Sequence, residues 1–198
     1  MRPRIFSLLA AGLALVACVS TPRGPLAEVG LPNFAKVDAR LYRGGQPTAS
    51  GIEELARQGV ATVVDLRRPE EKPPTRAAER AAVERLHMAY EAEPMSGLGA
   101  PRRAAIERLL AMIEDPGRAP VFVHCQRGAD RTGTVVAIYR VRHDCWSAEE
   151  AIREARQQGM AWFEFGMRRL IRAWYREVEA AGCTPAADAA SGPPGAMP

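Results

Sequence analysis

Lysine and an excess of either charge are what this 198-residue sequence most clearly lacks. Lys36 and Lys72 are its only lysines, and every other basic residue apart from the histidines is arginine. The formal net charge is +4, of which Arg2 and Arg4 near the N-terminus supply two. A balance this close to neutral argues against a nucleic acid as partner. The preference for Arg over Lys, with abundant Ala, is typical of a GC-rich genome.

Residues with the spacing of a metal site are also missing. The sequence has no Cys-x-x-Cys pair, and His87, His124 and His143 are far apart. Because zinc sites usually show paired ligands at short spacing, we expect no metal and no other cofactor. No internal repeat is present, and 47% hydrophobic content predicts one domain of about 150 residues with a single core.

The longest apolar run is too short to cross a bilayer. It covers residues 5–19, whereas a membrane-spanning helix needs about 20 residues. Because two arginines precede it, the run is typical of the h-region of a signal peptide. We therefore predict that residues 1–17 are a signal peptide and that the protein is exported.

The end of this run resembles the bacterial lipobox. Leu15-Val16-Ala17-Cys18 places a Cys where that motif is cleaved and lipidated. We predict a lipid anchor on Cys18 that holds a periplasm-facing protein to the membrane, with residues 18–32 as a flexible tether. Val19, in place of Asp, favours the outer membrane if the host is Gram-negative. The alternative is an ordinary signal peptide that is cleaved nearby, with Cys18 incidental.

The most informative stretch is residues 124–133, which read His-Cys-Gln-Arg-Gly-Ala-Asp-Arg-Thr-Gly. Residues 121–123 predict a buried strand before it, and residues 134–140 predict a buried helix after it. The intervening loop must turn its backbone N–H groups toward the helix N-terminus, where an anion is favoured. Gly128 and Gly133 permit the tight backbone of such a nest. The predicted phosphate-binding residues are Gln126, Arg127, Gly128, Ala129, Asp130 and Arg131.

Three side chains in this stretch fit a group-transfer reaction. A helix N-terminus and a nearby Arg favour the thiolate form of Cys125, which makes it a competent nucleophile. The guanidinium of Arg131 matches two phosphoryl oxygens at once. Thr132 can donate its hydroxyl to the sulfur when that sulfur leaves, and His124 is expected to support the loop by a hydrogen bond. A buried Cys beside a chance Arg is the competing interpretation.

The stretch resembles the signature of the Cys-dependent tyrosine and dual-specificity protein phosphatases, His-Cys, five residues, Arg, then Ser or Thr. The continuation Gly-Ala-Asp-Arg-Thr-Gly is similar to bacterial members, as are residues 41–47 and 63–67 and the segment from Tyr139 to the Ala-Glu-Glu-Ala helix. The resemblance covers roughly residues 33–180. It implies transfer through a phosphocysteine without a metal.

The general acid departs from the commonest pattern of that family. Many members carry an Asp on a separate loop, but residues 94–101 contain no carboxylate. Asp130, inside the signature, is used as the acid in some bacterial members and is our prediction. The alternative is a structural role in which Asp130 braces the loop or pairs with Arg127; Glu91, Glu93 and Asp65 would then be the candidates. For Asp65 and Arg67 we expect structural roles, with Arg67 pairing with Glu70.

Alternating strand and helix patterns predict an α/β fold of the protein tyrosine phosphatase type, with a parallel-rich central sheet flanked by helices. The phosphatase domain is predicted over residues 33–183, followed by a disordered tail at 184–198. We predict edge strands within 34–43, a buried strand at 60–66, a further strand at 88–93, and helices at 50–58, 75–87 (capped by Thr75), 101–114, 147–157 (capped by Ser147) and 160–181. The aromatic residues of the last helix are expected to pack in the core, and His143 to be solvent-exposed. Cys145 and Cys183 can form a disulfide or remain separate thiols.

The function favoured by these observations is a phosphatase for protein phosphotyrosine, with phosphoserine and phosphothreonine as further substrates. The same chemistry on inositol phosphates, phosphoinositides or another small phosphoester is the alternative. A phosphate-binding module without catalysis is disfavoured because Cys125 and Arg131 are both present. The expected partners are therefore a phosphorylated substrate and, through Cys18, a membrane.

Overall fold

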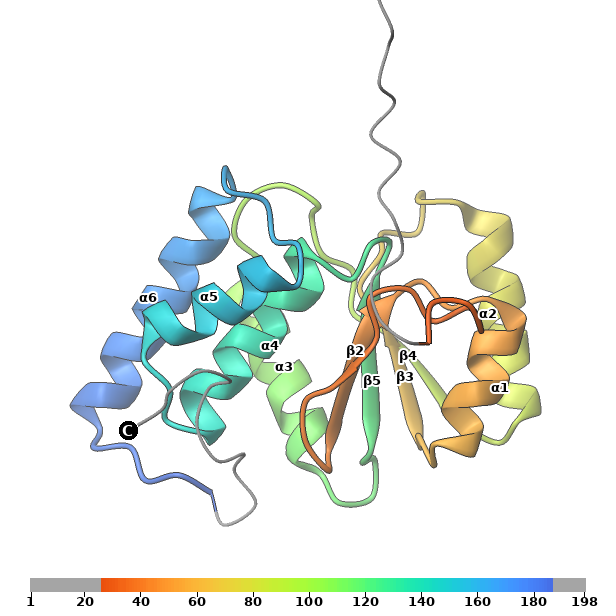
Figure 1. Ribbon diagram of the computed structural model, residues 1–198, viewed down its shortest axis with the longest axis horizontal. Coiled ribbons are helices and arrows are strands. Elements are labelled where there is room, and N and C mark those ends of the chain that lie inside the picture. Colours follow the sequence, from red (N-terminus) through yellow and green to blue (C-terminus); the bar gives the residue numbers. More distant parts are fainter. Residues whose placement is uncertain (1–25, 187–198) are drawn as a thin grey trace, which may run out of the picture.

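The computed structural model describes residues 26–186 as a five-stranded sheet with helices on both faces (Figure 1). The strand order is β1-β2-β5-β3-β4, and every pair is parallel except β1 with β2. This confirms the predicted parallel-rich α/β fold. The strands are β1 (Ala35–Lys36), β2 (Leu41–Gly45), β3 (Thr62–Asp65), β4 (Ala89–Ala92) and β5 (Val121–Cys125). The helices are α1 (Ala49–Arg57), α2 (Pro73–Arg85), α3 (Arg103–Glu114), α4 (Asp130–His143), α5 (Ala148–Gln157) and α6 (Phe165–Ala180).

Two apolar clusters hold the helices to opposite faces of the sheet. Along β5, Val121 and Val123 belong to the larger cluster with α3, α4, α5 and α6, whereas Phe122 belongs to the smaller one with α1 and α2. This division follows from the alternation of side chains along a strand. Because both faces are covered, the central strands are continuously hydrophobic, as the sequence predicts for residues 121–123.

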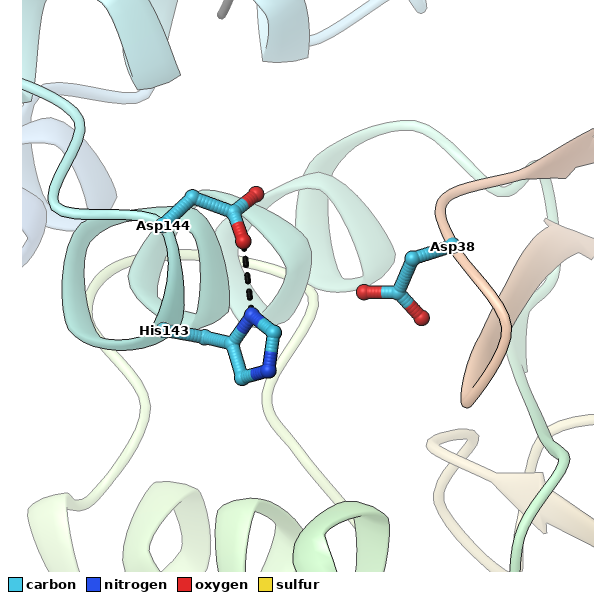
Figure 2. Close-up of side chains that lie close together, drawn as sticks. All are labelled: Asp38, His143 and Asp144. Atoms are coloured by element: carbon cyan, nitrogen blue, oxygen red, sulfur yellow. Dashed lines mark hydrogen bonds and ion pairs between the residues drawn. The ribbon is translucent and has the colours of Figure 1, made fainter. Parts of the chain in front are cut away.

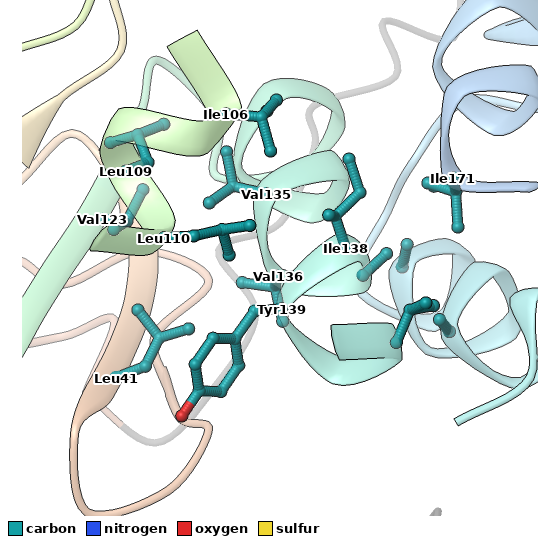
Figure 3. Packing of buried hydrophobic residues seen from close by; sticks show 14 of the residues in the cluster. Leu41, Ile106, Leu109, Leu110, Val123, Val135, Val136, Ile138, Tyr139 and Ile171 are labelled. Atoms are coloured by element: carbon teal, nitrogen blue, oxygen red, sulfur yellow. The ribbon is translucent and has the colours of Figure 1, made fainter. Parts of the chain in front are cut away.

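Helix α4 is the centre of the larger cluster. All of its residues except Arg142 are buried, because it is surrounded by the sheet, α3, α5 and α6. Figure 3 shows Val135 and Val136 facing residues of α3 and β5, and Ile138 facing α6. The helix that follows the signature is therefore packed on nearly all sides, which fixes the position of its N-terminus.

Several element boundaries differ from the predicted ones. Helix α2 begins at Pro73, so Thr75 lies inside it, and its N-cap Lys72 adopts a left-handed conformation without a side-chain cap. Two prolines at the first positions of α2 set the start instead, since their fixed φ suits the first turn. Strand β2 is not an edge strand, because β5 lies beside it and only β1 covers its other side. The predicted cap at Ser147 is confirmed as a capping box with Glu150.

The predicted helix at 160–181 is wrong at its start. Helix α6 begins only at Phe165, and residues 160–164 form an irregular connection from α5. Trp174 is buried as expected, but Trp162, Phe163 and Phe165 are 66%, 52% and 57% exposed. The five aromatic residues of this segment therefore divide into Trp174, which packs in the core, Tyr175, which is partly buried against it, and three that face solvent.

At least one residue before the predicted domain start packs against the core. Leu31, at the end of the predicted tether, is fully buried in the smaller cluster. Among residues 26–186, no helix is long and apolar enough to cross a membrane. The predicted signal peptide, Cys18 and most of the predicted tail lie outside the described residues.

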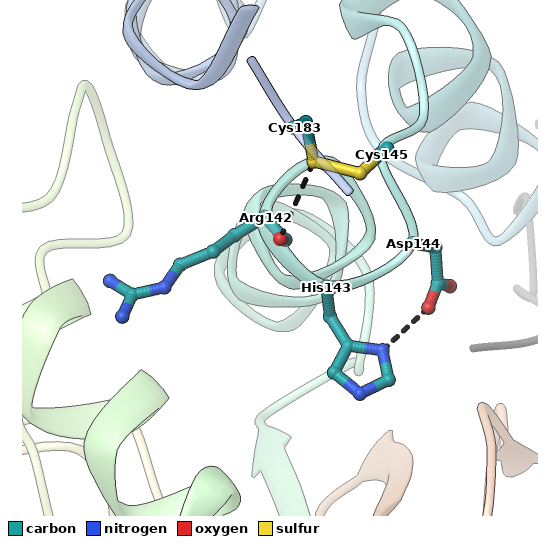
Figure 4. The surroundings of a disulfide bond; sticks show 5 residues. All are labelled: Arg142, His143, Asp144, Cys145 and Cys183. Carbon is teal, nitrogen blue, oxygen red and sulfur yellow. Dashed lines mark hydrogen bonds and ion pairs between the residues drawn. A yellow bond between two sulfur atoms is a disulfide. The ribbon is translucent and has the colours of Figure 1, made fainter. Parts of the chain in front are cut away.

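Cys145 and Cys183 form a disulfide in the structure, with Cα atoms 5.8 Å apart (Figure 4). Cys145 lies two residues after the end of α4, and Cys183 lies three residues after the end of α6. The bond therefore ties the end of the central helix to the end of the last one, across a sequence separation of 38 residues. The sequence left open whether these two cysteines form a disulfide or remain separate thiols, and the structure shows the disulfide.

Loss of this disulfide is expected to lower the free energy of unfolding by about 2–4 kcal/mol, because the cross-link limits the unfolded chain. Thermal unfolding of the oxidised protein with and without a thiol reductant measures the effect. A Cys183→Ser variant provides the control, since the reductant should then change nothing. Equal unfolding temperatures of the oxidised and reduced wild type would show that the bond contributes little.

Candidate active site

The predicted phosphate loop joins the end of β5 to the start of α4. Cys125 is the last residue of β5 and is 3% exposed, and Asp130 is the first residue of α4. Figure 1 shows this loop at the carboxyl end of the parallel strands, where ligands of open α/β sheets bind. Cys125 is the one free cysteine among the described residues. Its sulfur thus lies close to the unpaired N–H groups and positive dipole end of α4.

Close backbone packing gives this loop its shape. Gly128 has φ +72°, and a Cβ at this position would lie 2.4 Å from the carbonyl carbon of Gly44. Gly44 and Gly45 end β2, and Gly45 is the parallel partner of Cys125. Only a residue without a side chain fits at position 128. The glycines of β2 and of the signature therefore form one tightly packed unit.

The carbonyl groups of the loop are held by two buried side chains. Asn33 Nδ2 donates to the carbonyl oxygens of Arg127 and Gly128 at 3.3 and 3.0 Å, and to that of Gln158 at 2.9 Å. The Arg43 guanidinium also donates to Gly128 O. With these carbonyls turned outward and satisfied, the N–H groups of the loop remain available to an anion.

Arg131 is held in place by a carboxylate that the sequence analysis did not identify. Its Nη1 and Nη2 donate to Glu71 Oε1 and Oε2 at 2.8 and 3.0 Å. Burial lowers the pKa of Arg131, but the bonds to Glu71 and the charge of Cys125 outweigh it, and the net shift is upward. The same bonds outweigh burial at Glu71 and lower its pKa. Arg131 is therefore charged and oriented before a ligand arrives.

A buried charge network lies behind the loop. His124 is fully buried, with Nδ1 3.3 Å from Cys125 O and Nε2 2.8 Å from Glu79 Oε1. Arg67 donates to Asp65 at 2.8 Å and to Glu79 at 2.7 Å. The expected pairing of Arg67 with Glu70 is wrong, since Glu70 contacts Arg68 instead. Arg67, together with Arg76 beside Asp65, offsets the buried carboxylates of Asp65 and Glu79, which stiffens the strand ends that carry the loop.

Asp130 has both carboxylate oxygens engaged. Oδ1 accepts a hydrogen bond from Ala161 N at 2.8 Å, and Oδ2 accepts one from the guanidinium of Arg127. The bond to Ala161 ties the α5–α6 connection to the loop. Thr132 lies in the first turn of α4, and its hydroxyl has no hydrogen-bond partner among the described residues. In this conformation, Asp130 braces the loop as the alternative interpretation expects.

A second carboxyl group lies near Asp130. Glu164 is only 4% exposed, although it belongs to the same irregular connection as the exposed aromatics. Burial raises its pKa, and the negative charge of Asp130 raises it further. Raised pKa values of this kind are frequent at functional sites. Glu164 therefore holds a proton to higher pH than an exposed Glu.

The chain matches known phosphatases over most of its described length. A family model described as "PTP-NADK: DSP-PTPase phosphatase fused to NAD+ Kinase" matches residues 28–169. The chain belongs to this family of dual-specificity phosphatases. The match includes the sheet, the signature loop and the start of α6, and agrees with the resemblance carried by residues 124–133.

Two relatives illustrate the range of this phosphatase family. The dual specificity protein phosphatase TpbA of Pseudomonas aeruginosa is 28% identical over 127 residues, which is 64% of this chain and 55% of TpbA. The inositol diphosphatase DSP1 of rice is 31% identical over 111 residues, which is 54% of this chain and 49% of that protein. The chain thus spans about half the length of these two relatives. It spans 11% of a probable rice NAD kinase 2.

Solved structures show the same fold. The core catalytic domain of the PP-IP phosphatase SIW14 from S. cerevisiae superposes with a TM-score of 0.65 at 20% identity, over 77% of this chain and 94% of that domain. PTPMT1 superposes with a TM-score of 0.60 at 21% identity, over 75% and 97%. At this identity the likeness concerns the fold of the phosphatase family alone.

Two clusters among the described residues have the composition of a metal site, and in both some of the candidate ligand atoms already accept hydrogen bonds or form ion pairs. His143 Nδ1 lies 2.6 Å from Asp144 Oδ1, and Figure 2 marks this contact. Arg140 donates to Asp144 Oδ2. Asp38 Oδ1 accepts two backbone N–H groups. His143 is buried, so its expected exposure is wrong. In the cluster of Asp65, Glu79 and His124, the guanidinium of Arg67 supplies the cation.

Proposed function

We propose that this protein is a phosphatase that hydrolyses phosphate monoesters, with protein phosphotyrosine as its main substrate. The observation that carries the proposal is the position of Cys125 beside the N-terminus of α4, in a loop that also carries the pre-oriented Arg131. The family match supports the same activity. Phosphoserine and phosphothreonine are secondary substrates under this proposal.

The reaction we propose has two steps. The thiolate of Cys125 attacks phosphorus, the ester P–O bond breaks, and the leaving oxygen takes a proton from an acid. Water then attacks the phosphocysteine, the P–S bond breaks, and the acid recovers its proton from that water. Arg131 and the loop N–H groups hold the phosphoryl oxygens in both steps. The Thr132 hydroxyl stabilises the departing sulfur in the second step.

We propose Asp130 as the acid, once its ion pair with Arg127 opens. The Arg127 side chain is 63% exposed, so it can turn toward the phosphate of a bound substrate. Asp130 then keeps Ala161 N as a partner and has one oxygen free. The charge of Asp130 is one cause of the raised pKa of Glu164, so the two carboxyl groups lie close enough to interact. A neighbouring pair of carboxyl groups in different environments is a recurrent source of acid catalysis.

Asp130→Asn is expected to slow phosphotyrosine hydrolysis by about 10²–10⁴-fold, the usual contribution of a general acid. Hydrolysis of an activated aryl phosphate should fall much less, because its leaving group needs no proton. The alkaline limb of the pH–rate profile should flatten. Glu164→Gln serves as the comparison, since it removes the neighbour but keeps Asp130. Equal losses for both substrates, with an unchanged profile, would make Asp130 a brace only.

A substrate panel decides between the proposed function and its alternative. The alternative is the same chemistry on inositol phosphates or another small phosphoester, and the rice inositol diphosphatase relative favours it. The test compares kcat/KM, with and without EDTA, for four kinds of substrate: phosphotyrosine peptides, phosphoserine peptides, inositol phosphates and an aryl phosphate. We expect the phosphotyrosine peptide to be hydrolysed best and EDTA to change nothing. Preference for inositol phosphates would support the alternative, and no turnover at all would support a binding module.

We propose that the protein is exported and lipid-anchored through Cys18, facing the periplasm. The Cys145–Cys183 disulfide supports this, because disulfides persist in oxidising compartments. Cys18→Ser is expected to release the protein from membranes or to block its maturation, as measured by fractionation and mass spectrometry. Cys183→Ser should leave fractionation unchanged. Recovery of the wild type outside the membrane fraction with Met1 intact would contradict the proposal.

A further inference from the structure

Exposed apolar side chains are concentrated on one part of the molecule. Of five exposed large hydrophobic residues among those described, four lie in two segments, the β4–α3 loop and the α5–α6 connection with the first residue of α6: Leu98 (76%), Trp162 (66%), Phe165 (57%) and Phe163 (52%). The Trp162 ring meets those of Phe163 and Phe165 edge to face, with centroids 5.8 and 6.2 Å apart. We call these four residues the apolar rim. Exposed apolar patches on soluble domains frequently mark interaction sites.

The apolar rim is anchored to the phosphate loop. Ala161, next to Trp162, donates its N–H to Asp130 of the signature. The loop that carries Leu98 touches the first turn of α6, since a Cβ on Gly166 would lie 2.9 Å from Ala100 N. Figure 1 shows both connections at the same end of the molecule as the β5–α4 loop. The apolar rim therefore borders the site where a substrate phosphate would bind.

The charge of these two segments disfavours a membrane or a polyanion as the occupant. Residues 93–101 and 158–168 contain one basic residue, Arg168, and two acidic ones, Glu93 and Glu164. Arg168 is already used within the apolar rim, because its guanidinium lies 4.9 Å from the Phe165 ring centroid and donates to Trp162 O at 2.7 Å. Surfaces that bind anionic lipid or highly phosphorylated sugars carry several basic residues.

We infer that the apolar rim binds apolar side chains next to the phosphorylated tyrosine of a protein substrate. This inference rests on the proposed function and narrows it to phosphotyrosine in apolar sequence contexts. Aromatic residues suit such a role, because they offer a large contact area with few rotatable bonds. The hydrogen bonds through Ala161 and Arg168 hold the rings in place before binding, which lowers the entropic cost of association.

The test uses two phosphotyrosine peptides that differ only beside the phosphotyrosine, with Leu on both sides in one and Glu on both sides in the other. For the wild type, we expect kcat/KM for the Leu peptide to exceed that for the Glu peptide by about tenfold or more. A ratio of this size corresponds to the burial of one or two apolar groups. Trp162→Ala/Phe165→Ala should reduce this ratio to near one. Val29→Ala, at the fifth exposed hydrophobic residue, should leave the ratio as in the wild type.

Other outcomes would overturn the inference. If the wild type hydrolyses both peptides and a small aryl phosphate equally well, the apolar rim does not select substrates, although the proposed function stands. No hydrolysis of any of them would instead contradict the proposed function. A dimer that dissociates in Trp162→Ala/Phe165→Ala, measured by analytical ultracentrifugation, would assign the apolar rim to a second copy. Wild-type binding to lipid vesicles that the variant loses would assign it to a membrane.

Discussion

Replacement of Cys125 by Ser is expected to reduce turnover by about 10⁴–10⁶-fold, the cost of removing a nucleophile in enzymes that work through a covalent intermediate. A serine hydroxyl is not ionised at neutral pH, so the dipole of α4 and the charge of Arg131 cannot activate it. The loop should still bind phosphate, because its N–H groups and Arg131 are unchanged. Single-turnover kinetics and titration with a phosphotyrosine peptide measure both effects.

Cys183→Ser is the matched control for this prediction. It removes a cysteine that is 38 positions from its disulfide partner and far in sequence from the signature, and it leaves the nucleophile in place. Its kcat should stay near the wild-type value, whereas its stability should fall. Wild-type turnover by Cys125→Ser would contradict the proposed mechanism, because no phosphocysteine could then form.

Arg131→Lys is expected to lower kcat by about 10²–10³-fold, the loss typical of one transition-state hydrogen-bond donor in a preorganised site. A single ammonium group cannot contact two phosphoryl oxygens and Glu71 at the same time, whereas the guanidinium presents a planar set of donors. The effect should be larger on kcat than on KM, since the bonds strengthen as charge shifts in the transition state. Steady-state kinetics with a phosphotyrosine peptide give the separate changes in kcat and in KM.

Arg142→Lys is a suitable control, because Arg142 is an exposed residue near the far end of α4 that pairs with Glu114. Glu71→Gln extends the prediction: Arg131 keeps a partner but loses the ion pair, so kcat should fall by less than in Arg131→Lys. If Arg131→Lys retained full kcat, phosphate would have to be bound by another group.

Local sequence patterns were sufficient to predict the parts of the site that the chain forms over short distances. The strand, loop and helix around residues 121–143 follow from an apolar run, two glycines and a second apolar run, and the structure has all three elements. The capping box at Ser147 depends on four consecutive residues and was also predictable. In each case the determining residues are neighbours in the sequence.

The supporting residues could not be predicted in this way, because they come from distant segments. Glu71 reaches Arg131 across 60 positions, and Asn33 reaches Gly128 across 95. Glu79 reads as an ordinary polar residue of an Ala/Arg/Glu helix, yet it is buried against His124 and Arg67. Only the packing of α2 on the sheet brings it there. One feature of the sequence could have indicated Glu71. It follows the buried strand β3 by a few residues, and the carboxyl ends of parallel strands lie at the same sheet edge as the signature.

For the exposed aromatic residues the sequence led to a wrong prediction, since they were expected in the core. A run that contains Trp162, Phe163 and Phe165 with Met160 and Met167 has the hydrophobicity of a buried helix, and hydrophobicity alone cannot distinguish a core from an interaction surface. In the structure, Met160, Met167 and Trp174 fill the core. The rings of Trp162, Phe163 and Phe165 remain exposed, and the irregular connection before α6 is tied to Asp130 through the N–H of Ala161.

The buried amide of Asn33 has a consequence for defining a minimal catalytic unit. A fragment trimmed to start at β1 would keep the whole sheet, the nucleophile and every helix. It would nevertheless lose Leu31, which is fully buried, and the Pro32 carbonyl that accepts from Gly45 N at 2.7 Å. It would also lose the hydrogen bonds from Asn33 to Gly128 of the phosphate loop and to Gln158 at the end of α5. The segment before the first strand is therefore an integral part of the catalytic unit, and a shortened version should retain it from Leu26 onward.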